Sequence, residues 1–194
     1  FWFCNRNIAD IFSCVAVAHD TISSPMNMPK GQLLKRLREI GVISNEPVVL
    51  RGGVTAQFYC DMKKAYGYPD VLDALVLEIG KEISDDITAI IGSGYGGVPL
   101  AAILSLRYKR NFILVREQIK DHGKEERFDG YVPTKDDRVL IVDDVLTTGS
   151  SIRETILALK ETEATIVGAV VLVKRGEVKL PIPFSYILHI DELR

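Results

Sequence analysis

The stretch that decides the fold is Val139–Ser151, which reads VLIVDDVLTTGSS. Four apolar residues run directly into two acidic ones, and a short loop of hydroxyl side chains with one glycine comes before an amphipathic segment. The apolar run, residues 139–142, predicts a strand that is buried on both faces, as in a parallel sheet. The residues after it predict a loop at the carboxyl end of this strand and then the start of a helix. In an open α/β sheet, ligands bind at that edge.

Two kinds of binding chemistry stand side by side in this stretch. Asp143 and Asp144 can accept hydrogen bonds from sugar hydroxyls or help to hold a metal ion. The loop after them can surround a phosphate with backbone N–H groups, hydroxyls and the positive end of a helix dipole. Its members are Thr147, Thr148, Gly149, Ser150 and Ser151. Together these groups suggest a phosphorylated sugar. The simpler alternative is a surface acid pair before a helix that Ser150 or Ser151 caps.

Elsewhere, strand patterns alternate with helix patterns. We expect helices over 31–40, 69–83, 98–108 and 151–161, and strands over 88–91, 111–115, 165–173 and 184–189. This alternation predicts an α/β fold with a parallel twisted sheet flanked by helices. Residues 48–62 predict a small hairpin-like excursion before the main sheet. Residues 116–137 are polar throughout, and so long a connection is usually a functional lid or disordered.

The composition is that of a globular protein of ordinary size. Of its 194 residues, 47% are hydrophobic and 26% are charged, which suits one domain with a real core. The net charge of −2 gives no reason to expect binding to nucleic acid or membranes. Three cysteines without metal-ligand spacing suggest a reducing compartment: Cys4, Cys14 and Cys60. The three histidines are scattered, so no metal cluster is expected: His19, His122 and His189.

The first 27 residues differ from the rest of the chain, which starts at Phe1. Their apolar stretch, residues 8–18, is too short to span a bilayer and lacks the pattern of a secretory signal. We expect residues 1–27 to be an extension that is either not native or disordered. Residues 28–194 are then a single domain.

The motif at 139–151 resembles the phosphoribosyl pyrophosphate (PRPP) site of the type I phosphoribosyltransferases. The resemblance implies that the two acids bind the ribose 2′ and 3′ hydroxyls and that the following loop binds the 5′-phosphate. A second segment, Gly92–Gly97, resembles the pyrophosphate-binding loop of that family, although a plain strand–helix turn would also explain its glycines. Its expected ligand-binding residues are Ser93, Gly94, Tyr95 and Gly96. The orotate branch of the family often carries a lysine where this chain has Gly96.

Three further segments resemble the orotate branch. Arg116–Gly123 is similar to the mobile catalytic loop, with Lys120, Asp121, His122 and Gly123 in agreement and Glu117 as a departure. A solvated charged loop is the plainer alternative.

The base-binding segment of that branch resembles residues 50–65. Gly53, Phe58, Tyr59 and Asp61 agree, whereas Gly52, Ala56 and Gln57 depart. Arg175 matches the arginine that holds the orotate carboxylate, which a guanidinium can grip with two hydrogen bonds. The aromatic pair could instead be plain core or interface residues, and Arg175 a surface cation.

The resemblance implies transfer of a 5-phosphoribosyl group from PRPP to orotate, giving orotidine 5′-monophosphate and pyrophosphate. It assigns catalytic roles to Lys120, His122, Asp143 and Asp144, PRPP binding also to Arg116, and orotate binding to Arg51, Tyr59, Thr147 and Arg175. Mg²⁺ would be held mainly by PRPP and water near the acid pair. A cytoplasmic homodimer that shares the mobile loop is implied, with a small N-terminal hood over the sheet. The alternatives are a type I enzyme for another base and a PRPP-sensing regulator.

Overall fold

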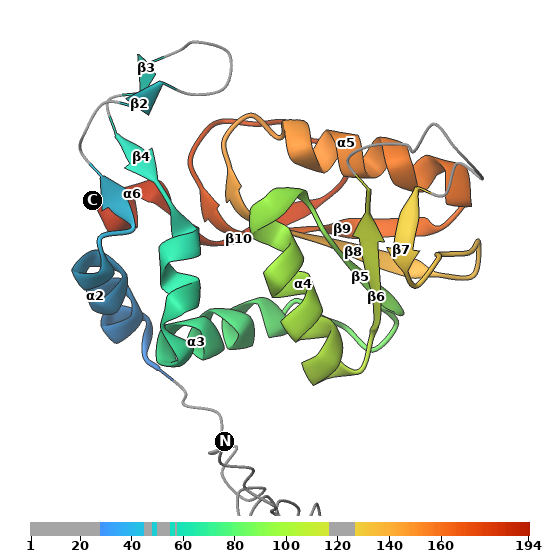
Figure 1. Cartoon of the computed structure of the whole chain (residues 1–194), viewed down its shortest axis with the longest axis horizontal. Helices are drawn as coiled ribbons and strands as arrows, with labels where there is room; N and C mark the ends of the chain where they lie inside the picture. Colours follow the sequence, from blue (N-terminus) through green and yellow to red (C-terminus); the bar gives the residue numbers. More distant parts are fainter. Residues whose placement is uncertain (1–27, 45–47, 50–54, 57, 117–126) are drawn as a thin grey trace, which may run out of the picture.

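A six-stranded sheet forms the centre of the molecule (Figure 1). The computed structural model describes residues 28–44, 48–49, 55–56, 58–116 and 127–194. The strands lie in the order β10 (Phe184–His189), β9 (Thr165–Lys174), β8 (Arg138–Leu146), β5 (Ala89–Gly92), β6 (Asn111–Val115) and β7 (Phe128–Gly130). All neighbours are parallel except β6 and β7, which pair antiparallel. The expected α/β class is confirmed.

Helices cover both faces of this sheet. α3 (Pro69–Gly80) and α4 (Gly94–Tyr108) lie on one side, and α5 (Ser150–Leu159) lies on the other (Figure 1). Side chains alternate between the faces along each strand. Leu140 and Val142 therefore join the core under α3 and α4, whereas Val139 and Ile141 join the core under α5. The four apolar residues before the acid pair thus anchor it from both faces.

A small N-terminal hood stands at one end of the sheet, as expected. It consists of α2 (Lys30–Ile40), β1 (Ile43–Ser44), β2 (Val48–Val49), β3 (Thr55–Ala56), β4 (Tyr59–Cys60) and the 3-10 helix η1 (Met62–Gly67). A hairpin is present in the predicted region as the β2–β3 pair, but its second arm was predicted wrongly at residues 57–62. The strand found there, β4, pairs with β1 instead. The last helix, α6 (Ile190–Leu193), lies against the hood, where Glu192 pairs with Lys30 at 2.6 Å.

Several predicted boundaries were wrong. β8 continues to Leu146 instead of ending at Val142, because β9 pairs with it as far as Leu146. The acid pair therefore lies within a strand and not in a loop. α4 begins at Gly94 rather than at residue 98, so most of the glycine-rich segment is the first turn of a helix. α3 ends at Gly80, three residues before the predicted end.

The polar run 116–137 contains a strand that the sequence did not predict. β7 pairs with the edge of the sheet at β6, and its Asp129 and Gly130 give it no apolar alternation. An edge strand with a charged side chain and a glycine is a common way to end a sheet, but it leaves little signal in the sequence. Among the described helices, none has the length and apolar character to cross a membrane.

Candidate active site

The acid pair lies where the order of the strands reverses. β5 and β8 are neighbours, and the chain continues from β5 toward one edge of the sheet and from β8 toward the other. At such a switch point the connections diverge and leave a crevice at the carboxyl ends of the strands. Gly92 lies opposite Val142, and the Ser93 N–H donates to the Val142 carbonyl at 2.8 Å. The two segments predicted to bind phosphates therefore begin side by side.

Gly94 brings these segments into contact. Its φ of +61° is a left-handed conformation that suits glycine. A β-carbon placed on Gly94 would lie 3.4 Å from Ser151 Oγ and 4.0 Å from Asp143 Oδ1. The first turn of α4, the first turn of α5 and the acid pair thus form one cluster, although α4 lies far from the other two in the sequence.

The acid pair is almost completely buried. Asp143 and Asp144 are 6% and 9% exposed. Asp143 Oδ1 accepts from the Asp144 N–H at 2.9 Å, and Asp144 Oδ1 accepts from the Val145 N–H at 2.8 Å. Burial, together with the neighbouring Asp144 charge, raises the pKa of Asp143 well above its usual value. A ligand with hydroxyl donors, or a cation, would therefore stabilise the ionised form of the pair.

We expect the substitution Asp143→Asn to stabilise the ligand-free protein at neutral pH. A carboxyl group whose pKa is higher in the folded than in the unfolded chain binds protons more readily when folded. The free energy of unfolding therefore falls as pH rises from the unfolded pKa through the folded one. Asparagine removes this loss, and we expect a gain on the order of 1 kcal/mol at pH 7. Urea unfolding between pH 4 and pH 8, in the presence of a chelator, measures it. An unchanged pH dependence would contradict the expectation.

Lys63, which the sequence did not single out, lies directly on the acid pair. Its Nζ atom is 3.3 Å from Asp144 Oδ2 and 3.0 Å from Asp61 Oδ1. Burial lowers the pKa of Lys63, but the Asp144 and Asp61 carboxylates outweigh this, and the net pKa is raised. The contact joins residues 81 positions apart, and nothing in the local sequence distinguishes Lys63 from Lys64.

At position 96, where the orotate branch often has a lysine, the Asp144 carboxyl group occupies the space beside the glycine. A β-carbon at Gly96 would overlap the carboxyl group of Asp144. The same backbone is held in place from the hood, since Tyr66 Oη donates to the Gly96 carbonyl at 2.8 Å. A side chain at position 96 and the observed position of Asp144 are therefore incompatible.

Residues 147–151, the predicted phosphate-binding segment, are held in place by contacts with α5 and with the loop after β9. Gly149 adopts a φ of +77° as the residue before α5. Arg153 donates to the Thr148 carbonyl at 2.6 Å and to the Lys179 carbonyl at 2.8 Å. A β-carbon on Gly176 would lie 2.6 Å from the Thr147 carbonyl oxygen. The loop after β9 thus packs on the loop after β8 and holds the start of α5 in place.

Arg175 meets the predicted base-binding segment across 117 positions of sequence. It donates to the Phe58 carbonyl at 2.9 Å, and its guanidinium lies 4.5 Å from the centre of the Phe58 ring. Arg194 approaches the same ring at 4.8 Å. Tyr59, the predicted stacking residue, is half-buried in β4.

The remaining predicted residues lie at the edge of the site or outside the described residues. Arg116, at the end of β6, pairs with Asp129 of β7. Tyr95 points outward and is 82% exposed. Arg51, Lys120 and His122 lie outside the described residues.

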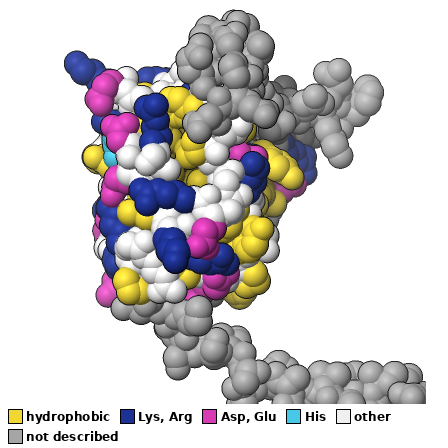
Figure 2. Space-filling view, turned by 90° about the vertical axis from the view of Figure 1, so that its left-hand side faces the viewer, with side chains coloured by type: hydrophobic (Ala, Val, Ile, Leu, Met, Phe, Trp, Pro, Cys, Tyr) yellow, Lys and Arg dark blue, Asp and Glu magenta, His cyan; other side chains and the backbone are white. Residues whose placement is uncertain are grey.

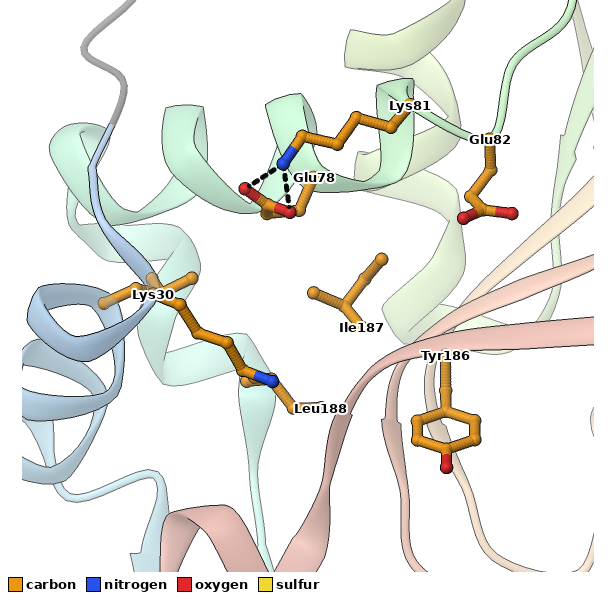
Figure 3. Close-up of a pocket in the computed structure, with 8 residues that line it drawn as sticks. Lys30, Glu78, Lys81, Glu82, Tyr186, Ile187 and Leu188 are labelled. Carbon is orange, nitrogen blue, oxygen red and sulfur yellow. Dashed lines mark hydrogen bonds and ion pairs between the residues drawn. The ribbon is translucent and has the colours of Figure 1, made fainter.

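A pocket of about 220 Å³ is lined by residues of α2, the end of α3 and β10 (Figure 3). Lys81 and Glu78 of its lining pair with each other, and Glu82 accepts from Ser185. None of the residues predicted to bind ligand lines it. In the part of the chain that the structure describes, no group of three metal-ligating side chains occurs.

Comparison with known proteins defines the class. The model of the phosphoribosyl transferase domain matches residues 69–189, which include β5, β8, the acid pair and Arg175. The orotate phosphoribosyltransferase of Methanosphaera stadtmanae is 36% identical over 149 residues, which is 76% of this chain and 83% of that protein. That of Aeropyrum pernix is 38% identical over 149 residues, which is 75% of this chain and 78% of the relative.

Solved structures agree with these relatives. The crystal structure of the Aeropyrum pernix orotate phosphoribosyltransferase superposes with a TM-score of 0.71 at 30% identity, covering 83% of this chain and 95% of that one. An adenine phosphoribosyltransferase from Rhodothermus marinus, at 21% identity and a TM-score of 0.62, covering 83% of this chain and 100% of that one, shares the fold alone. The chain belongs to the phosphoribosyltransferases and, within them, to the orotate phosphoribosyltransferase family.

Proposed function

We propose that this protein transfers the 5-phosphoribosyl group of PRPP to N1 of orotate, with Mg²⁺, to give orotidine 5′-monophosphate and pyrophosphate. The observation that carries the proposal is the buried acid pair at the β5–β8 switch point, with the starts of α4 and α5 on either side of it. Carboxylates suit ribose hydroxyls, and two adjacent helix starts suit the phosphates at the two ends of PRPP.

In this reaction the acid pair orients the ribose and stabilises its transition state. Pyrophosphate leaves the anomeric carbon, so positive charge develops on the ribose ring. Asp143 and Asp144 accept hydrogen bonds from the ring hydroxyls and place negative charge near the developing cation, where it is effective because the site is buried. Ser150, Ser151 and the N–H groups that begin α5 hold the 5′-phosphate, and the first turn of α4 faces the pyrophosphate.

Magnesium suits the oxygen-rich donor set of the acid pair and the substrate phosphates. Because the described residues offer no cluster of three ligating side chains, the substrate and water would supply most of its ligands, with Asp143 and Asp144 nearby. Bound there, the ion neutralises charge on the leaving pyrophosphate.

The family membership also motivates the rest of the proposal. Residues 28–194 act as one phosphoribosyltransferase domain, and two copies form a homodimer in the cytoplasm. Arg116, Lys120 and His122 close over the pyrophosphate and exclude water, which suppresses hydrolysis of PRPP. Arg51, Tyr59 and Thr147 contact orotate.

The loss of orotate absorbance on addition of PRPP and Mg²⁺ tests this function directly. We expect a decrease that stops when a chelator is added. No decrease, with intact PRPP binding, would favour a type I enzyme for another base or a PRPP-sensing regulator. A regulator would usually need a nucleic-acid surface, and on the hood side of the molecule basic and acidic side chains are interspersed (Figure 2).

Arg175→Ala distinguishes orotate from bases without a carboxylate. We expect KM for orotate to rise by about tenfold to a hundredfold, since a charge-assisted hydrogen bond contributes roughly 1.5–3 kcal/mol, while Kd for PRPP changes little. Arg175→Lys should recover only part of the loss, because an ammonium cannot form the planar two-bond contact. Steady-state kinetics with orotate as the varied substrate measures both variants. If KM is unaltered in the alanine variant, Arg175 does not bind the base.

A further inference from the structure

Among the residues that the structure describes, Lys63 is the cation that contacts the acid pair. Its Nζ atom contacts Asp144 from the hood, and η1 is tied to the first turn of α4 by the Tyr66–Gly96 hydrogen bond. Hood, acid pair and predicted pyrophosphate segment therefore meet at one point. A side chain at position 96 would overlap Asp144 where it stands, and glycine itself brings no charge to the site.

We propose that Lys63 binds the pyrophosphate group of PRPP and supplies the positive charge that Gly96 cannot. This inference rests on the proposed function. An ammonium group carries three N–H donors. Two of them have acceptors among the described residues, Asp144 Oδ2 and Asp61 Oδ1, and the side chain is 35% exposed. The third donor is therefore available to an oxygen of a ligand that enters the crevice.

The geometry of the substrate brings its pyrophosphate to this donor. The carbon that carries the pyrophosphate is bonded directly to the carbon that carries the 2′ hydroxyl. A ribose whose hydroxyls lie on Asp143 and Asp144 consequently has its leaving group within a few ångströms of the Asp144 carboxyl. Lys63 Nζ is 3.3 Å from that carboxyl, and its flexible stem of four carbons can follow the group as it leaves.

Charge balance supports the same assignment. Two buried carboxylates would repel a substrate with phosphates at both ends unless a cation stands between them and the pyrophosphate. Lys63 occupies that position and remains charged, since the adjacent carboxylates hold its pKa above the ordinary value. It thus neutralises Asp144 before PRPP binds and the pyrophosphate afterwards.

Binding measurements on the full chain test this role. The variants are Lys63→Met, Lys63→Arg and Lys64→Met. The last is a matched control because Lys64 is the neighbouring lysine of η1 and donates to the Gly41 carbonyl, away from the acid pair. Titration calorimetry would use PRPP, inorganic pyrophosphate and ribose 5-phosphate, all with Mg²⁺. Circular dichroism verifies that each variant is folded.

We expect Lys63→Met to raise the Kd of PRPP and of pyrophosphate by about tenfold to a hundredfold, the range for a charged hydrogen bond. The Kd of ribose 5-phosphate should rise by less than about threefold. Lys63→Arg should retain most of the affinity, and Lys64→Met should bind all three ligands as the wild type does. Unchanged pyrophosphate binding, or an equal loss of all three ligands, would overturn the proposal, since the latter means that Lys63 only holds Asp144 in place. Wild-type protein that does not bind PRPP would instead contradict the proposed function.

Discussion

Asp144→Asn is expected to lower kcat/KM for PRPP by about a hundredfold to a thousandfold. The substitution replaces a charged acceptor by an amide whose NH₂ group repels a hydroxyl donor, and one charge-assisted hydrogen bond contributes roughly 1.5–3 kcal/mol. It also removes negative charge from beside the developing ribose cation in a site only 9% exposed. A total of about 3–4 kcal/mol corresponds to this loss of rate. Initial rates with PRPP varied at saturating orotate measure it.

Asp137→Asn is the matched control for this substitution. Asp137 is also buried, at 5% exposure, but it precedes β8 at the opposite end of the strand. It accepts hydrogen bonds from Thr88 and Tyr131 and two more from Thr134. We expect the free energy of unfolding of the Asp137→Asn variant to fall by about 1–3 kcal/mol, while its kcat/KM for PRPP stays that of the wild type. If the two variants lose activity equally, the effect of Asp144 comes from the fold and not from the ribose.

Two strands of the central sheet were predicted with the bounds that the structure shows. β6 and β10 have the predicted bounds, Asn111–Val115 and Phe184–His189, because Arg110 and Arg116 flank the first run and Pro183 precedes the second. β8 was predicted too short, because a strand that carries two aspartates after its apolar half resembles a strand that has ended. Only the neighbouring β9, which pairs with it to Leu146, keeps the chain extended there.

The site was predictable in its loops but not in its cross-chain contacts. The acid pair and the loop after it can be recognised in the sequence because their residues are contiguous. Lys63 joins them from the hood, and a contact between residues 81 positions apart leaves no local pattern. In the sequence, Gly96 stands where the resembling family often has the positive charge of a lysine. The structure gives the reason: the space that a side chain would need is filled by the Asp144 carboxyl.

Gly96→Ala is therefore expected to damage the site although it replaces glycine by the best helix former. The new methyl group would overlap the Asp144 carboxyl group, which a Val145 N–H and Lys63 hold in place. A displacement of about 1 Å at a reacting group can cost on the order of a hundredfold in rate, and we expect kcat/KM for PRPP to fall by at least that much. Kinetics with varied PRPP, together with thermal melting, measures the effect.

Gly31→Ala separates this steric effect from helix propensity. Gly31 lies in the first turn of α2, and a β-carbon there meets nothing within 4 Å. Alanine favours a helix over glycine by up to about 1 kcal/mol, so this variant should keep full activity and melt no lower than the wild type. Gly96→Ala with wild-type kinetics would mean that α4 can shift away from β8. The position of Asp144 would then be adjustable, and the absence of a side chain at position 96 would need another cause.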